Sequence, residues 1–154
     1  MNHTDTAIKS SMRLFLGFGA GLLSTLVFHQ IALALLWAVG IAPFAPFNMG
    51  PTFPFGAPAT LSLAFWGGVW GIVFAFVDKR FPAGGGYWIA AFLFGAILPT
   101  LVALLVVAPL KGAPVGGGLR PLLWLTAILI NGVWGIGTGV FLRMFSGVGR
   151  RALG

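Results

Sequence analysis

Four long apolar stretches, at residues 14–41, 59–77, 87–108 and 122–142, dominate the chain. Each is long enough to cross a bilayer core of roughly 30 Å as an α-helix, because a helix rises about 1.5 Å per residue. Charged residues make up only 7 % of the 154 residues, whereas a soluble domain carries about 25 %. So few charges cannot solvate a water-soluble surface. The sequence therefore predicts an all-α membrane protein, with four transmembrane helices in a single integral membrane domain.

The basic residues are divided unequally between the two sides of the predicted bundle. One side holds only Lys111 and Arg120, and the other side holds Lys9, Arg13, Lys79, Arg80, Arg143, Arg150 and Arg151. Basic residues collect on the cytoplasmic side of multi-pass proteins. We therefore expect cytoplasmic tails at residues 1–13 and 143–154, both termini on the inner side of a bacterial inner membrane, and no nucleic-acid partner.

A five-residue phrase in the second apolar stretch, Gly68–Ile72, returns letter for letter in the fourth as Gly132–Ile136. A Gly-Ala-Pro triplet also occurs twice, at residues 56–58 and 112–114. Both copies of the phrase would cross the membrane in the same direction, which predicts two tandem helical hairpins related as a parallel repeat. A chance match in a chain rich in glycine and tryptophan is the alternative.

Small residues recur at helical spacing in the predicted spans. Such faces let helix backbones approach closely, which drives helix association in lipid. The predicted packing residues are Gly17, Gly21, Gly68, Gly71, Gly132, Gly135 and Gly139. Trp70 and Trp134, inside the repeated phrase, are expected to fill the space beside these glycines.

Three polar residues interrupt the apolar stretches: His29 and Gln30 in the first and Asn131 in the fourth. At about 1.5 Å per residue, His29 and Asn131 lie roughly 14–16 Å below the predicted outer boundary, so they could meet near the midplane. Two interpretations stay open. Either His29 bonds to Thr25 or Asn131 and fixes helix register, or these residues, with Trp66, bind a polar group of a ligand such as a quinone carbonyl.

The segment from Pro43 to Pro58 contains five prolines, four phenylalanines and no charge. Proline at this density prevents a helix and favours turns and extended backbone. We expect the segment to lie at the outer interface as an amphiphilic cap over the bundle. A lid over a binding site is the alternative.

Several chemistries lack their residues. The chain has no cysteine, its only histidines are His3 and His29, and no acidic residue falls within a predicted span. These absences exclude thiolate metal sites and bis-histidine haem ligation within one subunit. No catalytic motif is present. We therefore expect no catalytic residues, no metal, no cofactor and no enzymatic activity.

Three segments together resemble a family of small four-span bacterial inner-membrane proteins for which no activity is established. They are Phe28-His29-Gln30, the Pro/Phe/Met-rich loop, and Ser62–Gly71. The resemblance implies the four-span fold and the inner-membrane location, and it brings no site residues.

Two functional hypotheses follow from the sequence. The leading one is a non-enzymatic packing protein, either a homo-oligomer or an accessory subunit of a larger membrane complex, because the glycine faces exceed what one small bundle needs. The rival is a small transporter or ligand-binding protein of the lipid or quinone type. That protein would use His29, Gln30, Asn131 and Trp66 at a midplane polar site.

Overall fold

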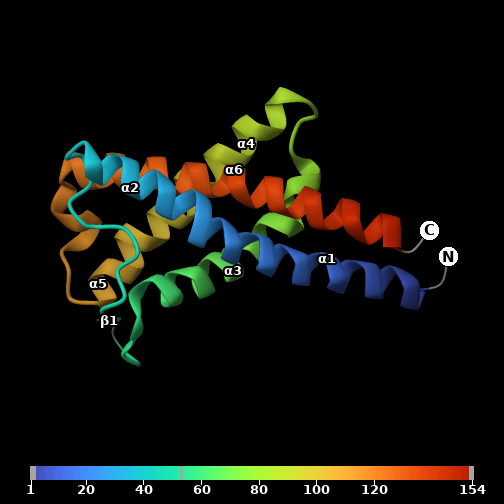
Figure 1. The fold of residues 1–154 in the computed structure, drawn as a ribbon, viewed down its shortest axis with the longest axis horizontal. Coiled ribbons are helices and arrows are strands. Elements are labelled where there is room, and N and C mark those ends of the chain that lie inside the picture. Colours follow the sequence, from blue (N-terminus) through green and yellow to red (C-terminus); the bar gives the residue numbers. More distant parts are fainter. Residues whose placement is uncertain (1–2, 53, 153–154) are drawn as a thin grey trace.

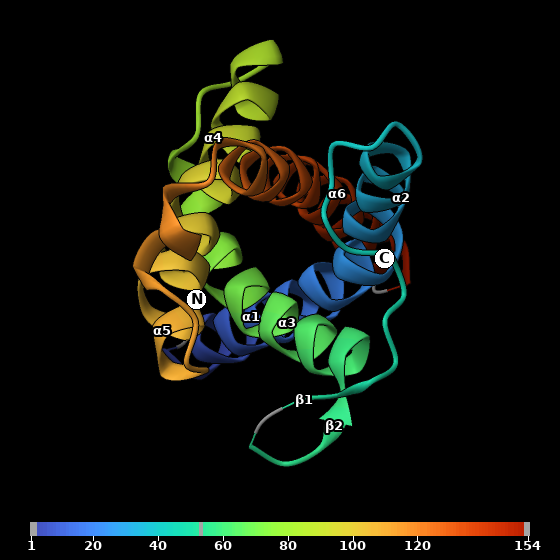
Figure 2. The ribbon, with the colours of Figure 1, turned by 90° about the vertical axis from the view of Figure 1, so that its left-hand side faces the viewer.

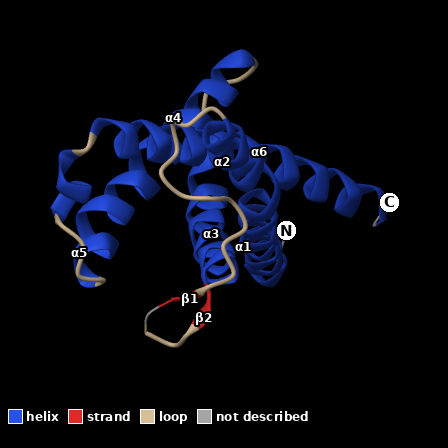
Figure 3. Ribbon diagram, turned by 60° about the vertical axis from the view of Figure 1, so that its left-hand side comes forward, coloured by secondary structure: helices blue, strands red, loops and turns tan. Residues whose placement is uncertain are grey.

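The computed structural model describes residues 3–52 and 54–152, and most of them are helical (Figure 3). Four helices in this part of the chain are long and apolar enough to cross a membrane. They span Ser10–Ala38, Ala59–Arg80, Gly85–Leu110 and Pro121–Gly147. The predicted all-α fold with four membrane-length helices is confirmed.

The first hairpin comprises residues 3–80. Its first long helix contains one π-helical turn, and the backbone stays right-handed helical on both sides of it. A short antiparallel strand pair in the following loop joins Pro51 to Pro58 and Thr52 to Ala57. In chain order the elements are α1 (His3–Ser24), the π-turn η1 (Thr25–His29), α2 (Gln30–Ala38), β1 (Pro51–Thr52), β2 (Ala57–Pro58), α3 (Ala59–Val77) and the 3-10 turn η2 (Asp78–Arg80).

The second hairpin comprises residues 85–152 and also has a π-helical turn in its first long helix. This turn begins four residues after Pro99, a buried proline inside α4. Proline lacks the N–H of the helical ladder, and π-turns are common where that ladder is disturbed. The elements are α4 (Gly85–Val102), η3 (Ala103–Val107), α5 (Ala108–Leu110), the 3-10 segment η4 (Val115–Leu119) and α6 (Pro121–Ala152).

The helix ends differ from the predicted boundaries. The helix α1 already begins at His3 and α6 continues to Ala152, so the described parts of the predicted tails extend these helices. Between residue 1 and Pro43, and again after Pro121, the sequence has no proline to stop a helix. The described residues of the proline-rich segment form no helix, as predicted.

The two helices of the first hairpin pack backbone against backbone. A Cβ atom added to Gly21 would lie 2.8 Å from the Cα of Gly71, and one added to Gly17 would lie 2.6 Å from the carbonyl oxygen of Gly71. Any side chain at these positions would push α1 and α3 apart. The predicted small-residue contact therefore joins these two helices, with Gly67 as a further member.

The second hairpin packs in the same manner. A Cβ atom on Gly95 of α4 would meet the backbone of Asn131 and lie 3.1 Å from the amide nitrogen of Gly135 on α6. Gly68 and Gly132, the first residues of the repeated phrase, each lie under a phenylalanine ring, of Phe18 and Phe92 respectively. Gly139 faces the ring of Tyr87.

The helices α1 and α6 join the hairpins, and both described chain ends lie at one end of the bundle, opposite the loops at 39–58 and 111–120 (Figure 1). The Ser24 hydroxyl donates to the Trp134 carbonyl oxygen at 2.7 Å, and the Trp134 indole donates to the Gly21 carbonyl oxygen at 2.9 Å. A cluster of aromatic rings centred on Phe74 fills the core between the two hairpins.

Candidate functional site

A cavity of about 1030 Å³ lies between the two hairpins. Toward the chain ends, α3 and α4 meet through the rings of Phe74 and Phe94, whose centroids are 5.3 Å apart. Toward the loops, α3 and the α4–α5 helix make little contact, and both supply lining residues. Figure 2 looks along the bundle from this loop end. Ligand sites commonly measure roughly 300–1000 Å³, so the cavity is large enough for a small lipid or a ring with a chain.

The cavity lining is exposed in two places: at the outer loops, around Phe44, Phe55 and Leu110, and between α3 and the α4–α5 helix. At this second, lateral opening the exposed lining residues are Leu63, Trp66, Val102 and Val107. All four are apolar, as a surface facing hydrocarbon requires. The opening therefore connects the cavity sideways with the surroundings of the helices.

His29 and Gln30 lie side by side on the wall formed by η1 and the start of α2. The Gln30 side chain is 2 % exposed, and its Oε1 accepts a hydrogen bond from the Phe47 backbone N–H at 2.6 Å. Its Nε2 lies 3.4 Å from His29 Nδ1. Gln30 thus holds the outer loop against the helix. Phe47 has a left-handed φ of 51° there.

Asn131 reaches the cavity from the facing wall on α6. Its Nδ2 donates to Thr100 Oγ1 at 2.9 Å, and the Thr100 hydroxyl donates in turn to the Ala127 carbonyl oxygen at 3.2 Å. Thr100 is fully buried beside Pro99 in α4. This chain of bonds ties α4 to α6 and fixes the orientation of the Asn131 amide.

The two tryptophans of the repeated phrase have different surroundings, and a third lies at the opening. Trp134 is 2 % exposed. Trp70 is half-buried, borders the cavity and packs edge-on against Phe94. Trp66 lines the opening and is 58 % exposed. Trp134 also lines the cavity but is almost fully enclosed, so Trp66 and Trp70 are the indoles that a bound molecule could contact over a broad face.

The outer loop and one lysine form the rim of the cavity. Lys111 Nζ donates to Thr52 Oγ1 at 3.1 Å, which links the two outer loops. The Thr60 hydroxyl and amide both donate to the Asn48 carbonyl oxygen. Lys111 is the sole charged residue among the described lining residues. The proline-rich segment therefore borders the cavity. This position is compatible both with the predicted cap and with the alternative of a lid over a binding site.

All four ligand-binding residues predicted from the sequence, namely His29, Gln30, Asn131 and Trp66, line this one cavity. The bond partners differ from those expected. His29 makes no hydrogen bond to Thr25 or Asn131 among the described residues, because Thr25 bonds to the Gly21 carbonyl oxygen of its own helix at 3.0 Å. The register-fixing bond expected for His29 is therefore absent from this part of the chain.

Sequence reasoning missed a charged cluster at the opposite end. Asp78 is 7 % exposed, and its carboxylate pairs with the guanidinium of Arg13 and accepts a hydrogen bond from the Tyr87 hydroxyl at 3.3 Å. Arg143 stacks on the Tyr87 ring at 3.6 Å from its centroid. These four residues come from four different helical segments and close the bundle at this end.

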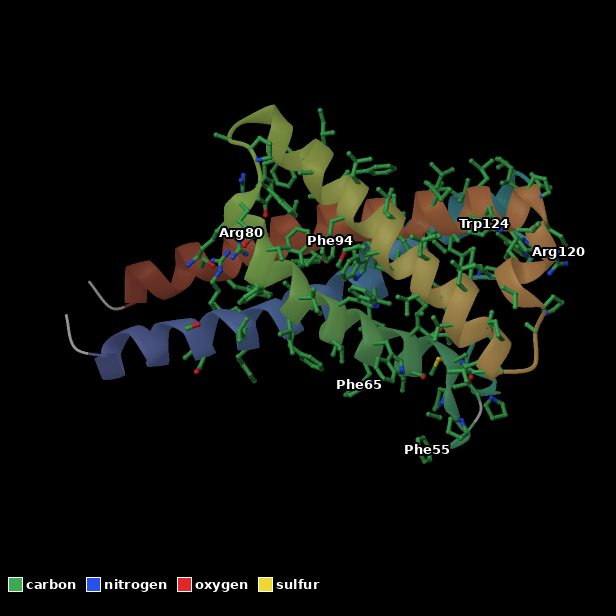
Figure 4. The ribbon with its side chains drawn as sticks, turned by 180° about the vertical axis from the view of Figure 1, so that it is seen from behind. Phe55, Phe65, Arg80, Phe94, Arg120 and Trp124 are labelled. Atoms are coloured by element: carbon green, nitrogen blue, oxygen red, sulfur yellow. The ribbon has the colours of Figure 1, made fainter. Side chains whose placement is uncertain are left out.

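The signal for this cluster was present in the sequence. Apart from Asp5, Asp78 is the only acidic residue, and Arg13 begins an apolar stretch. A charge at the edge of a membrane span usually has a partner. In Figure 4, Arg80 lies toward the end where this cluster sits, whereas Phe55, Trp124 and Arg120 mark the loop end.

The described residues contain no group of three or more histidine, cysteine or acidic side chains that could hold a metal ion. The cavity lining offers hydrogen-bonding side chains and apolar contacts. No protein-family model, curated protein or solved structure matches the chain.

Proposed function

We propose that the protein binds a lipid-like ligand in the cavity between its two hairpins, and that it does so as a multi-pass protein of the bacterial inner membrane. One observation carries the proposal. Polar groups from both hairpins, His29 and Asn131, line the inner part of a cavity of about 1030 Å³ whose other walls are mainly apolar. Buried polar residues in membrane proteins usually mark a functional site or an interhelical bond. For His29 no interhelical bond is found among the described residues.

The opening supports an amphiphilic ligand over a water-soluble one. A molecule that enters between α3 and the α4–α5 helix passes exposed apolar side chains such as Leu63, Trp66 and Val102. Such a route favours a hydrocarbon chain, which lipid already dissolves. The head group would reach His29 and Asn131, and the chain would lie along the opening. This amounts to the lipid or quinone type of binding expected from the sequence.

The packing hypothesis has less support. It depended on the expectation that the helices carry more glycine faces than packing within one bundle uses. Yet Gly17, Gly21, Gly71 and Gly135 all face glycine or backbone of the neighbouring helix in the same hairpin. Close packing within the chain therefore accounts for them. We also propose that the protein is not an enzyme. Lys111 is the one charged residue among the described lining residues, so the lining contributes no acidic side chain for catalysis.

We also propose that the hairpins arose by duplication. The phenylalanine rings of Phe18 and Phe92 cover corresponding glycines of the repeated phrase. Gly56 and Gly112, which open the two Gly-Ala-Pro triplets, both have left-handed φ angles, of 67° and 80°. Parallel repeats place both termini on one side, and the excess of basic residues puts that side in the cytoplasm.

A filling mutation tests the proposed site. Ala103→Phe adds a ring to the cavity lining, and Leu105→Phe places the same ring at an exposed position two residues away that is not part of the lining. We expect wild type and Leu105→Phe to retain a co-purified amphiphile through extensive detergent washing. Ala103→Phe should retain at least tenfold less. Native mass spectrometry, followed by lipid extraction, measures the bound molecule.

Two results would contradict the proposal. One is wild-type protein, extracted gently, that carries no bound amphiphile and binds none on addition of a total lipid extract. The other is equal retention by both variants when both elute as the wild type does from a sizing column.

A further inference from the structure

The hydrogen bonds around the cavity define which chemical group it accepts, and this inference rests on the proposed function. Gln30 Oε1 accepts from the Phe47 N–H, so the amide nitrogen of Gln30 must face His29 Nδ1. An amide NH₂ only donates, which makes Nδ1 the acceptor. A neutral imidazole then carries its proton on Nε2.

His29 Nε2 is open to the cavity. The histidine lines it, and its only side-chain hydrogen bond among the described residues uses Nδ1. No buried side-chain nitrogen or oxygen in the described residues lacks a partner, so an unbonded Nε2 cannot be sealed in. The first wall therefore presents an N–H donor.

The facing wall presents an acceptor. Thr100 donates its own proton to the Ala127 carbonyl oxygen, so its oxygen must accept from Asn131 Nδ2. That assignment turns Asn131 Oδ1 away from Thr100, and Oδ1 has no partner among the described residues. By the same reasoning as for Nε2, this oxygen is open to the cavity.

We infer that the cavity selects a lipid with a neutral, hydroxyl-bearing head group, such as a long-chain alcohol or a quinol. A hydroxyl can accept from an N–H such as His29 Nε2 and donate to an oxygen such as Asn131 Oδ1, so it matches the group that each wall presents. A carbonyl or an ether satisfies only His29. A phosphate or carboxylate would bring negative charge to Asn131 Oδ1, and the one cationic side chain of the described lining, Lys111, lies at the rim.

Three probes with the same chain test this selection: hexadecanol, its methyl ether and hexadecyl phosphate. Binding to the purified full-length protein in detergent can be followed by tryptophan fluorescence, because Trp66 and Trp70 line the cavity. One hydrogen bond corresponds to about a tenfold difference in affinity. We expect hexadecanol to bind about tenfold more tightly than the ether, and the phosphate to bind more weakly than the alcohol.

The variant Asn131→Leu removes the acceptor and keeps the apolar contacts. It should bind alcohol and ether equally, at the affinity that wild type has for the ether. Should Asn131→Leu fail to fold, Thr100→Val serves instead, because it frees the Asn131 amide to rotate and should reduce the preference for the alcohol. Thr126→Val, whose hydroxyl bonds only within its own helix, is the matched control and should keep the preference.

The outcomes separate the two proposals. Equal binding of alcohol and ether by wild type, or tightest binding of the phosphate, would overturn the selection while leaving a lipid site in place. Persistence of the alcohol preference in both Asn131→Leu and Thr100→Val would overturn the role of Asn131. Absence of binding by all three probes would count against the lipid site itself.

Discussion

The two hairpins share a phrase of sequence and a mode of packing, yet their tryptophans have different roles. Trp134 of the second hairpin is buried and donates its indole N–H to Gly21 of the first hairpin. Trp70 of the first hairpin is half-buried and packs edge-on against Phe94, although both tryptophans line the cavity. Identical phrases therefore place one enclosed indole in the contact between the hairpins and leave the other partly exposed.

A second difference precedes the phrase in each hairpin. The first has Gly67, where a Cβ atom would collide with the Thr25 side chain. The second has Asn131, whose amide reaches Thr100 and the cavity. The same backbone position thus serves close packing in one hairpin and carries a polar group in the other. A single residue difference next to the same phrase therefore gives the second hairpin a polar group on the cavity wall.

The largest expected effect separates the two tryptophans. Trp134→Ala removes a buried ring and its hydrogen bond, which should lower the free energy of unfolding by about 3–5 kcal/mol. Trp70→Ala should cost about 1–2 kcal/mol, since this ring is only half-buried. Unfolding in mixed micelles with increasing denaturing detergent measures both. Equal losses would show that the two rings are energetically equivalent, against the comparison above.

The next effect concerns the junction of the hairpins at the end away from the cavity. Asp78→Ala leaves the Arg13 guanidinium and the Tyr87 hydroxyl without their shared carboxylate, at an expected cost of about 2–3 kcal/mol. The double variant Arg13→Ala/Asp78→Ala should be no less stable than Asp78→Ala alone, because the two side chains act together. Additive losses in this double-mutant cycle would mean that the pair is not coupled.

The matched glycines test whether the hairpins pack alike. Gly71→Ala and Gly135→Ala should each cost about 1–3 kcal/mol, because each added methyl group meets the backbone of the facing helix. Gly19→Ala is the control, since its nearest neighbour would be a Phe145 ring atom at 3.8 Å. The same unfolding assay applies. A loss at Gly71 without one at Gly135 would separate the two contacts.

The smallest effect isolates the hydrogen bonds of Thr100, which connect α4 and α6 of the second hairpin. Thr100→Val breaks the bonds to Asn131 and Ala127, and interhelical hydrogen bonds in membranes contribute about 0.6 kcal/mol on average. Thr126→Val removes a bond within one helix and should cost less. A larger loss for Thr126→Val would mean that the Thr126 hydrogen bond within α6 contributes more to the free energy of unfolding than the hydrogen bonds between α4 and α6.

The sequence alone determined the four membrane-length helices, the irregular loop from Pro43 to Pro58 and four of the residues that line the cavity. Each follows from a local property: apolar length, proline density, or the cost of a polar side chain in hydrocarbon. Counting residues along two helices put His29 and Asn131 at similar depth. The sequence therefore indicated that both could lie at one site.

Only the tertiary structure decided which surfaces face each other. A glycine stripe looks the same whether it packs inside a hairpin or against another copy, so the partner of Gly71 could not be read from spacing. Identical letters likewise gave no means to tell the buried Trp134 from the half-buried Trp70, and the partners of Asp78 come from helices far apart in sequence. Helix formation depends on neighbours along the chain, whereas cavities and ion pairs depend on how the helices cross.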